Sequence, residues 1–368
     1  MKKPIIQNIL VPIDLSKMSV QAIETAKRLA QRSGGTVHLV HVYEFNYPAG
    51  FMAPGIWYTP PSIVAQEQQA QALTKNLGAL VRQHGLSPVN CHLISGAPAF
   101  DKICRIAQQI PADLIVMPTH GHTGLKHVFL GSTAERVVQH SPCPVFVVRS
   151  RKRKPTTRRT SIAHTILVPV DFSNCSRDGL RYAIGFAKEF GAKIILLHAT
   201  YLGYIYSTEG TALYDIPGLQ KAAQENAERQ MQKLVRSLQF GRVKFETAFT
   251  EGSPALDICS FAKDHDVDLI ITSTHGLTGF QHVLIGSIAE KVARHAPCSV
   301  LVVPSHPKIR MANLAKAGGR RTRALPGQRQ LRKSLRGQAL TKRDRKLAAH
   351  AFPERRKTNK FRESHANR

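Results

Sequence analysis

The chain has 368 residues, is 42% hydrophobic and carries a net charge of +28, so it is long enough to bury the cores of two ordinary domains. No segment approaches the ~18 consecutive apolar residues of a membrane-spanning helix, and the breaks at Pro4, Gln7 and Asn8 argue against a signal peptide. The six cysteines are widely spaced without a C-x-x-C, which argues against a disulfide framework or a zinc site and favours a reducing compartment, the cytoplasm.

Short apolar runs alternate with longer helical patterns along residues 1–149. The predicted elements are, in chain order, strand Ile9–Ile13, helix Val20–Arg32, strand Val37–Tyr43, helix Ile63–His84, strand Val89–Ile94, helix Phe100–Gln109, strand Leu114–Pro118, helix Thr133–His140 and strand Val145–Val148. Because runs such as ILVPI lack polar alternation, these strands are predicted to be buried on both faces of a sheet. The pattern is typical of a doubly wound parallel α/β sheet, in which ligands bind at the carboxyl edge of the strands.

The same series recurs later in the chain at an offset of 155 to 157 residues. The segment NILVPIDLS at 8–16 returns as TILVPVDFS at 165–173, and ADLIVMPTHG at 112–121 returns as VDLIITSTHG at 267–276. This repetition predicts a duplicated domain of about 145 residues rather than a solenoid of short units. We divide the chain into domain 1–149, linker 150–161, domain 162–304 and tail 305–368.

The excess positive charge falls in the linker and the tail. The stretch RSRKRKPTTRR at 149–159 has seven basic residues and no acid, and residues 305–368 have 20 Lys and Arg against three acids. A tail with so few apolar residues is predicted to be disordered. Such a tail can bind RNA, DNA or ribosomes through nonspecific contacts to phosphates, although an extension that only improves solubility remains the other interpretation.

Each repeat contains a glycine-rich loop after its fourth predicted strand. Gly121 and Gly276 permit a positive φ or a close approach of the backbone to a ligand. Ten residues later a second glycine, Gly131 or Gly286, opens a helix whose free N–H groups and positive dipole end form a natural anion site. The candidate phosphate-binding residues that follow these glycines are Ser132, Thr133, Ser287 and Ile288.

A purely structural interpretation of the same residues is equally favoured by the local pattern. STAE and SIAE fit a capping box, in which Ser132 or Ser287 caps the helix and Glu135 or Glu290 reaches back. The two interpretations are compatible, because a single cap leaves other N–H groups available to a phosphate.

A carboxylate follows the first strand of each repeat, at Asp14 and Asp171. In a doubly wound sheet these side chains lie at the ligand edge, where a carboxylate suits ribose hydroxyls or a metal bound to phosphates. The common catalytic motifs G-x4-G-K-[ST], G-x-G-x-x-G, H-E-x-x-H and G-x-S-x-G are absent from the sequence. We therefore expect neither a catalytic residue nor a resident metal site, and the protein is not predicted to be an enzyme.

Two pairs of repeated segments carry a family resemblance: VPIDLS with VPVDFS, and the segment from DLIV to VFVV with the segment from DLII to VLVV. In combination, they resemble a tandem universal stress protein over residues 1–304. The resemblance implies two Rossmann-like, five-stranded parallel sheets of the adenine nucleotide alpha hydrolase type. It also implies that the last strands of the two repeats, Val145–Val148 and Val300–Val303, pair with each other and form an internal pseudo-dimer. Whether the whole chain also forms a homodimer is left open.

Nucleotide-binding members of that family carry G-x2-G-x9-G-[ST], whose second and third glycines match Gly121 and Gly131 and, in the second repeat, Gly276 and Gly286. The first glycine of the motif is replaced by Pro118 in the first repeat and by Ser273 in the second. Because proline lacks an N–H and has a fixed φ, the second repeat is favoured as the nucleotide-binding one.

By resemblance, Val42 and Ala199 offer backbone contacts to adenine, and the ligand is ATP, with or without Mg²⁺, or a related adenine nucleotide. The implied function is a stress response through binding or signalling, with any ATP hydrolysis slow and incidental. The alternative is an interaction protein without a nucleotide whose basic tail binds nucleic acid.

Overall fold

The computed structural model describes residues 6–43, 63–119, 130–149, 162–200, 217–274 and 286–304. In the first repeat the elements are β1 (Asn8–Pro12), α1 (Lys17–Ser33), β2 (Thr36–Tyr43), α2 (Ile63–His84), β3 (Val89–Ser95), α3 (Ala99–Gln109), β4 (Leu114–Pro118), α4 (Ser132–His140) and β5 (Val145–Val148). In the second repeat they are β6 (Thr165–Pro169), α5 (Asn174–Phe190), β7 (Lys193–Thr200), α6 (Pro217–Arg236), β8 (Phe245–Glu251), α7 (Pro254–Asp264), β9 (Leu269–Ser273), α8 (Ser287–His295) and β10 (Ser299–Val303).

All nine elements predicted for the first repeat are present, and their ends differ from the prediction by three residues or fewer. The largest difference is at α1, which begins at Lys17 because Ser16 occupies the N-cap position with an extended backbone. None of the helices in the described ranges has the length and apolar character needed to cross a membrane. The basic tail, residues 305–368, and most of the linker lie outside the described residues, so their predicted properties stay predictions.

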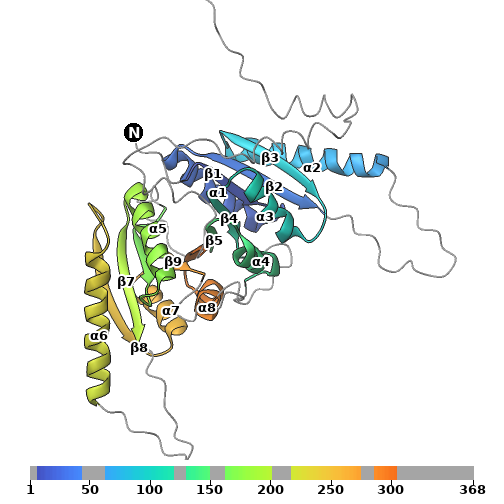
Figure 1. Ribbon diagram of the computed structural model, residues 1–368. Coiled ribbons are helices and arrows are strands. Elements are labelled where there is room, and N and C mark those ends of the chain that lie inside the picture. The colour runs from blue at the N-terminus through green and yellow to red at the C-terminus, as the bar shows by residue number, and fades with distance from the viewer. Residues whose placement is uncertain are drawn as a thin grey trace, which may run out of the picture. The chain divides into compact units, whose positions relative to one another are not determined.

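The strands form one sheet in the order β3-β2-β1-β4-β5-β10-β9-β6-β7-β8 (Figure 1). Within each repeat the paired strands are parallel, whereas β5 and β10 pair antiparallel, with Val147 opposite Val300 and Val145 opposite Val302. The predicted fold class is therefore confirmed, and so is the pairing of the two last strands. Each repeat keeps its own carboxyl edge because the direction of the strands reverses only at the join.

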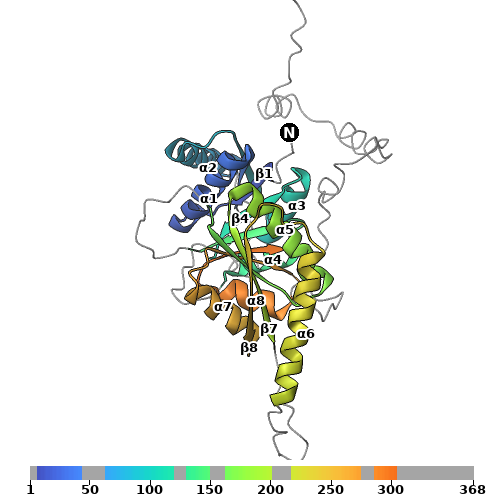
Figure 2. The same ribbon diagram turned by 90° about the vertical axis from the view of Figure 1, so that its left-hand side faces the viewer.

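The two faces of the sheet are covered by different helices. Along β1, Ile9 and Val11 belong to the hydrophobic cluster that contains α1 and α5, whereas Leu10 belongs to the cluster that contains α3, α4, α7 and α8. This alternation explains why the strands are apolar throughout, since successive side chains point to opposite covered faces. On the second face, α7 and α8 lie side by side (Figures 1 and 2).

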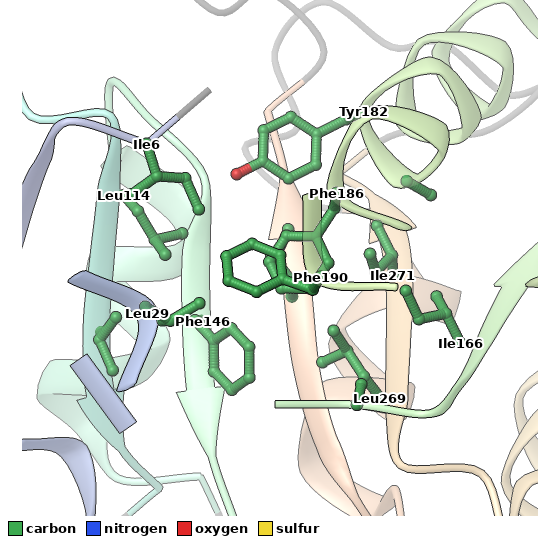
Figure 3. Close-up of a cluster of buried hydrophobic side chains, with 14 of the residues drawn as sticks. Ile6, Leu29, Leu114, Phe146, Ile166, Tyr182, Phe186, Phe190, Leu269 and Ile271 are labelled. Carbon is green, nitrogen blue, oxygen red and sulfur yellow. The ribbon is translucent and has the colours of Figure 1, made fainter. Parts of the chain in front are cut away.

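The two repeats also share a hydrophobic core beside the β5–β10 join. Figure 3 shows Ile6 and Phe146 of the first repeat facing Phe186 and Phe190 of the second. These side chains are buried, and the rings of Phe186 and Phe190 lie 4.3 Å apart between centroids. The repeats are thus joined by packing as well as by strand pairing, and their described residues belong to one compact unit.

A buried histidine of the first repeat makes stability depend on pH. His38 Nδ1 lies 3.2 Å from His92 Nε2, and His38 Nε2 lies 3.3 Å from Asn8 Oδ1. Burial, and then the charge of His92, lower the pKa of His38 to about 4, and burial also lowers the pKa of His92. Below its ordinary pKa of about 6.5 the unfolded state binds the proton and the folded state does not, so stability falls as the pH falls.

From this shift we expect the His38 contribution to lower the free energy of unfolding by about 2 kcal/mol between pH 7.5 and pH 5. The second repeat has Ile195 at the equivalent position. Urea unfolding of wild type and His38→Ile at both pH values measures the effect, because the variant should lose that part of the pH dependence. An equal change with pH in the two proteins would show that His38 is not responsible.

Candidate functional site

A tight turn at the end of the first strand of each repeat holds the predicted carboxylate. In the first repeat Asp14 Oδ1 accepts hydrogen bonds from the Ser16 N–H at 3.0 Å and from the Ser19 hydroxyl at 2.5 Å. In the second, Asp171 Oδ1 accepts from the Ser173 N–H at 3.0 Å. Both carboxylates therefore lie at the carboxyl edge of the sheet, as the sequence predicted, with one oxygen turned into the loop.

The residue after each carboxylate has a left-handed backbone although it is not glycine. Leu15 has a φ of 64° and Phe172 a φ of 65°. Bulky side chains rarely adopt this conformation, which costs energy and is concentrated at functional sites. Because it occurs in both repeats, we interpret it as a property of the turn that presents the carboxylate.

A histidine on the second strand of each repeat fixes this turn. His41 Nδ1 lies 2.8 Å from the Ile13 carbonyl oxygen, and His198 Nδ1 lies 2.8 Å from that of Val170. Since a carbonyl oxygen only accepts, Nδ1 is the donor in both contacts. The recurrence of these histidines in the sequence thus has a structural explanation, because they hold the backbone next to Asp14 and Asp171.

The helices that follow the glycine-rich loops begin differently from the predicted capping box. Gly131 and Gly286 are the N-caps of α4 and α8, and neither helix has a side-chain hydrogen bond at its cap. The capping-box prediction is wrong because Ser132 and Ser287 are already the first residues of their helices, one position too late to cap.

The first-turn N–H groups of α4 and α8 therefore lack the predicted serine cap. A hydrogen bond from each N-cap glycine fixes the position of the helix start, from Gly131 N–H to the Thr119 oxygen at 2.7 Å and from Gly286 N–H to the Thr274 oxygen at 2.5 Å. A helix N-terminus held in this way is suited to an anion, because its N–H groups and its dipole both favour negative charge.

A cavity of about 490 Å³ lies at the carboxyl edge of the second repeat. Five residues predicted from separate parts of the sequence line it: Asp171, Ala199, Gly286, Ser287 and Ile288. Gly276, the sixth residue predicted in this repeat, lies outside the described residues, as does Gly121 in the first repeat. A cavity of this volume is within the range of pockets that hold small molecules.

The walls of the cavity divide into an apolar part and a polar part. Leu197, Pro254 and Ile258 contribute apolar surface, while Thr272 and Ser273 at the end of β9 contribute polar groups beside the start of α8. The sequence analysis did not select Pro254, Ile258 or Thr272 as site residues. The repeated G-x-P after the third strand was the signal for Pro254, but nothing local indicated that Ile258 and Thr272 face the same space.

The corresponding residues of the first repeat occupy the same positions in the fold. Asp14 follows β1, Val42 lies near the end of β2, and Gly131, Ser132 and Thr133 open α4. Around them, however, the first repeat carries larger side chains than the second. The pairs of equivalent residues, first repeat before second, are Ile13 and Val170, Val42 and Ala199, Tyr43 and Thr200, and Met117 and Thr272. The opposite holds at Thr133, whose counterpart is Ile288.

Within the described part of the chain, no group of three or more His, Cys, Asp or Glu side chains is arranged to hold a metal ion. Burial raises the pKa of the thiols of Cys104 and Cys143 to about 12, so both are protonated near neutral pH.

Comparisons with known proteins show the family and the fold of the chain. The model of the universal stress protein family matches residues 6–149 and 163–304. A universal stress protein of Methanocaldococcus jannaschii is 33% identical over 148 residues, which cover 40% of this chain and 85% of the relative. One from Mycolicibacterium smegmatis is 26% identical over 306 residues, covering 80% of this chain and 96% of the relative. The crystal structure of one from Archaeoglobus fulgidus, 17% identical, covers 82% of this chain and 97% of its own with a TM-score of 0.53, which shows the fold alone.

Proposed function

Because the chain belongs to the universal stress protein family, we propose that its second repeat binds ATP or a related adenine nucleotide and that the protein acts in a stress response through this binding. The observation that supports the proposal best is the cavity at the carboxyl edge of the second repeat. Residues predicted after the first strand, at the end of the second strand and at the start of α8 all line it. Such convergence is expected of a ligand site at a sheet edge.

Each part of the nucleotide has a matching part of the cavity. The backbone at Ala199, beside Val170 and Leu197, suits the adenine ring, and the Asp171 carboxylate suits the ribose hydroxyls or a Mg²⁺ ion bound to the phosphates. The N–H groups at Ser287 and Ile288 suit the phosphates, because they belong to the first turn of α8. The loop glycine Gly276 completes the proposed site on the evidence of the sequence alone.

The second repeat is favoured over the first because it has smaller side chains at two cavity positions and a backbone N–H that the first repeat lacks. Where the second repeat has Thr272 and Ala199, the first repeat has the larger residues Met117 and Val42. These larger side chains leave less space at two walls of the equivalent site. Pro118 also lacks the N–H that Ser273 has. We therefore propose one occupied site per chain, with Asp14, Val42, Gly121, Gly131, Ser132 and Thr133 serving a structural role in the first repeat.

Binding rather than catalysis is proposed because the titratable groups at the cavity already have structural roles. Of the described residues that line it, Asp171 and His198 are the ones with an acidic or basic side chain. Asp171 Oδ1 accepts from Ser173, and His198 Nδ1 is directed at the Val170 carbonyl. Any hydrolysis of ATP is accordingly expected to be slow. Separately, the cytoplasm is the proposed location of the protein, because its cysteines suit a reducing compartment.

The proposal is tested by titrating ATP into the purified chain and two matched variants, with isothermal calorimetry as the measurement. Ala199→Leu adds side-chain volume to the wall of the cavity, and Val42→Leu places the same side chain at the equivalent position of the first repeat. We expect Ala199→Leu to weaken ATP binding at least about tenfold, the usual scale for overpacking, and Val42→Leu to leave it within twofold. No affinity of the wild type for ATP, and no adenine nucleotide released on denaturation, would refute the proposal.

A second candidate function is supported by the location of the positive charge. The tail carries 20 basic residues against three acids, and counterion release from that many contacts gives a steep salt dependence of binding to nucleic acid. We expect a truncation to residues 1–304 to bind RNA more weakly than the full chain at low salt, by at least about tenfold in fluorescence anisotropy. Equal affinities would remove the tail from consideration.

Analytical ultracentrifugation of the full chain and of the truncation to residues 1–304 tests whether the chain also forms the homodimer left open by the sequence.

A further inference from the structure

The first repeat holds the C-terminal end of α8, the helix whose N-terminus lines the cavity. Arg149, directly after β5, donates from Nη2 to the carbonyl oxygens of Arg294 at 2.8 Å and Ala293 at 3.2 Å. Its backbone N–H also donates to the Ser299 hydroxyl at 3.1 Å. A cation on the last carbonyls of a helix is stabilised by the helix dipole, so Arg149 fixes the end of α8 both by hydrogen bonds and by charge.

A second contact between the repeats involves the first turns of both site helices. Arg294 Nη2 lies 2.7 Å from Glu135 Oε1 of α4 and 3.0 Å from Glu290 Oε1 of α8. Glu135 and Glu290 are the acidic residues in the first turns of their helices. The three side chains are 24% to 33% exposed, so solvent screens these ion pairs less than it would on an open surface.

The two arginines of this arrangement have no counterparts at the equivalent positions of the other repeat. The position equivalent to Arg149 in the second repeat is Pro304, and the position equivalent to Arg294 in the first repeat is Gln139. Neither residue carries a charge, so these two positions supply no cation to the C-terminal end of α4 or to its first-turn carboxylate from within the first repeat. The duplicated chain is therefore asymmetric at α8, the helix that lines the cavity.

We infer that Arg149, Glu135 and Arg294 are positioning residues through which the first repeat fixes α8 for phosphate binding in the second. The inference rests on the proposed nucleotide site and adds residues that do not line the cavity. Arg294 neutralises Glu290, whose carboxylate would otherwise repel a phosphate at the first turn of α8. Arg149 and Glu135 hold the body of the helix, so its N–H groups keep their direction toward the cavity.

The electrostatic part is tested by ATP titration of Arg294→Gln, which introduces the residue of the first repeat. We expect the affinity to fall about fivefold, since a carboxylate near the helix terminus changes the free energy of the bound anion by an amount of this order. Arg294→Lys keeps the charge and should recover most of the loss. Lys291→Gln is the matched control, because it removes a charge from an exposed position of the same helix and should change the affinity less than twofold.

The mechanical part is tested without nucleotide, by hydrogen exchange of the amides at residues 290–295, whose N–H groups donate within α8. Arg149→Met and Glu135→Gln are expected to speed this exchange at least about fivefold, whereas Lys291→Gln leaves it unchanged. Failure of the wild type to bind ATP would refute the proposed function, and the exchange data would then decide the inference alone. Unchanged exchange in both variants, or an unchanged affinity for ATP in Arg294→Gln, would overturn it even if thermal stability fell.

Discussion

Replacing Thr272-Ser273 by Met-Pro, the pair found at Met117-Pro118 in the first repeat, is expected to weaken ATP binding at least about thirtyfold. Thr272 and Ser273 line the cavity at the end of β9, so the methionine side chain and the proline ring would take up space that the nucleotide needs. Overpacking of this kind costs about 2 kcal/mol, which corresponds to a thirtyfold change in affinity. The substitution should fold, because β4 of the first repeat has the same pair with Met117 buried.

The reverse exchange provides the control. Placing Thr-Ser at Met117-Pro118 changes the first repeat by the same two residues and should leave the affinity for ATP within twofold, since the proposed site is in the other repeat. Calorimetric titration of both variants, with circular dichroism to check folding, gives the comparison. Equal loss of affinity in the two variants, or none in either, would contradict the assignment of the site to the second repeat.

Truncation of Phe186 to alanine is expected to lower the free energy of unfolding by about 3 to 5 kcal/mol. Phe186 has no exposed surface, its ring packs against Phe190, and Figure 3 shows it between the two repeats near Phe146. The loss combines the apolar surface of the ring with the cavity left behind, which neighbouring residues from two repeats cannot easily fill. Urea unfolding followed by circular dichroism measures the change.

Leu256→Ala is the matched stability control. Leu256 lies on α7 and is 67% exposed, so its truncation should change the free energy of unfolding by less than about 0.5 kcal/mol. A loss below 1 kcal/mol for Phe186→Ala would mean that the aromatic cluster does not join the repeats, and that the β5–β10 pairing alone holds them together.

Most of the fold could be predicted from the sequence because its determinants are local. Runs such as ILVPI predicted strands covered on both faces, and β1 places Ile9 and Leu10 in two different hydrophobic clusters. Because the sequence is duplicated, each element predicted in one repeat could also be predicted at the equivalent residues of the other. Pairing of β5 with β10 did not follow from the residues themselves and depended on the resemblance to a family.

The parts of the site that could not be predicted depend on exact positions and on distant contacts. A capping box requires Ser132 to precede the helix by one residue, whereas in the structure Gly131 is the N-cap and Glu135 contacts Arg294 of the other repeat. No sequence pattern indicates a contact between residues 159 positions apart. The lining of the cavity likewise depends on which side chains face the same space, as at Thr272.

Photolabelling with 8-azido-ATP, followed by mass spectrometry of the labelled peptides, tests most directly whether one nucleotide binds in the second repeat. Equilibrium dialysis on the same preparation gives the number of ATP molecules per chain. We predict one molecule per chain, with the label on peptides from residues 162–304 and competition by unlabelled ATP. Labelling of residues 6–149, two molecules per chain, or no specific labelling would contradict the proposed site.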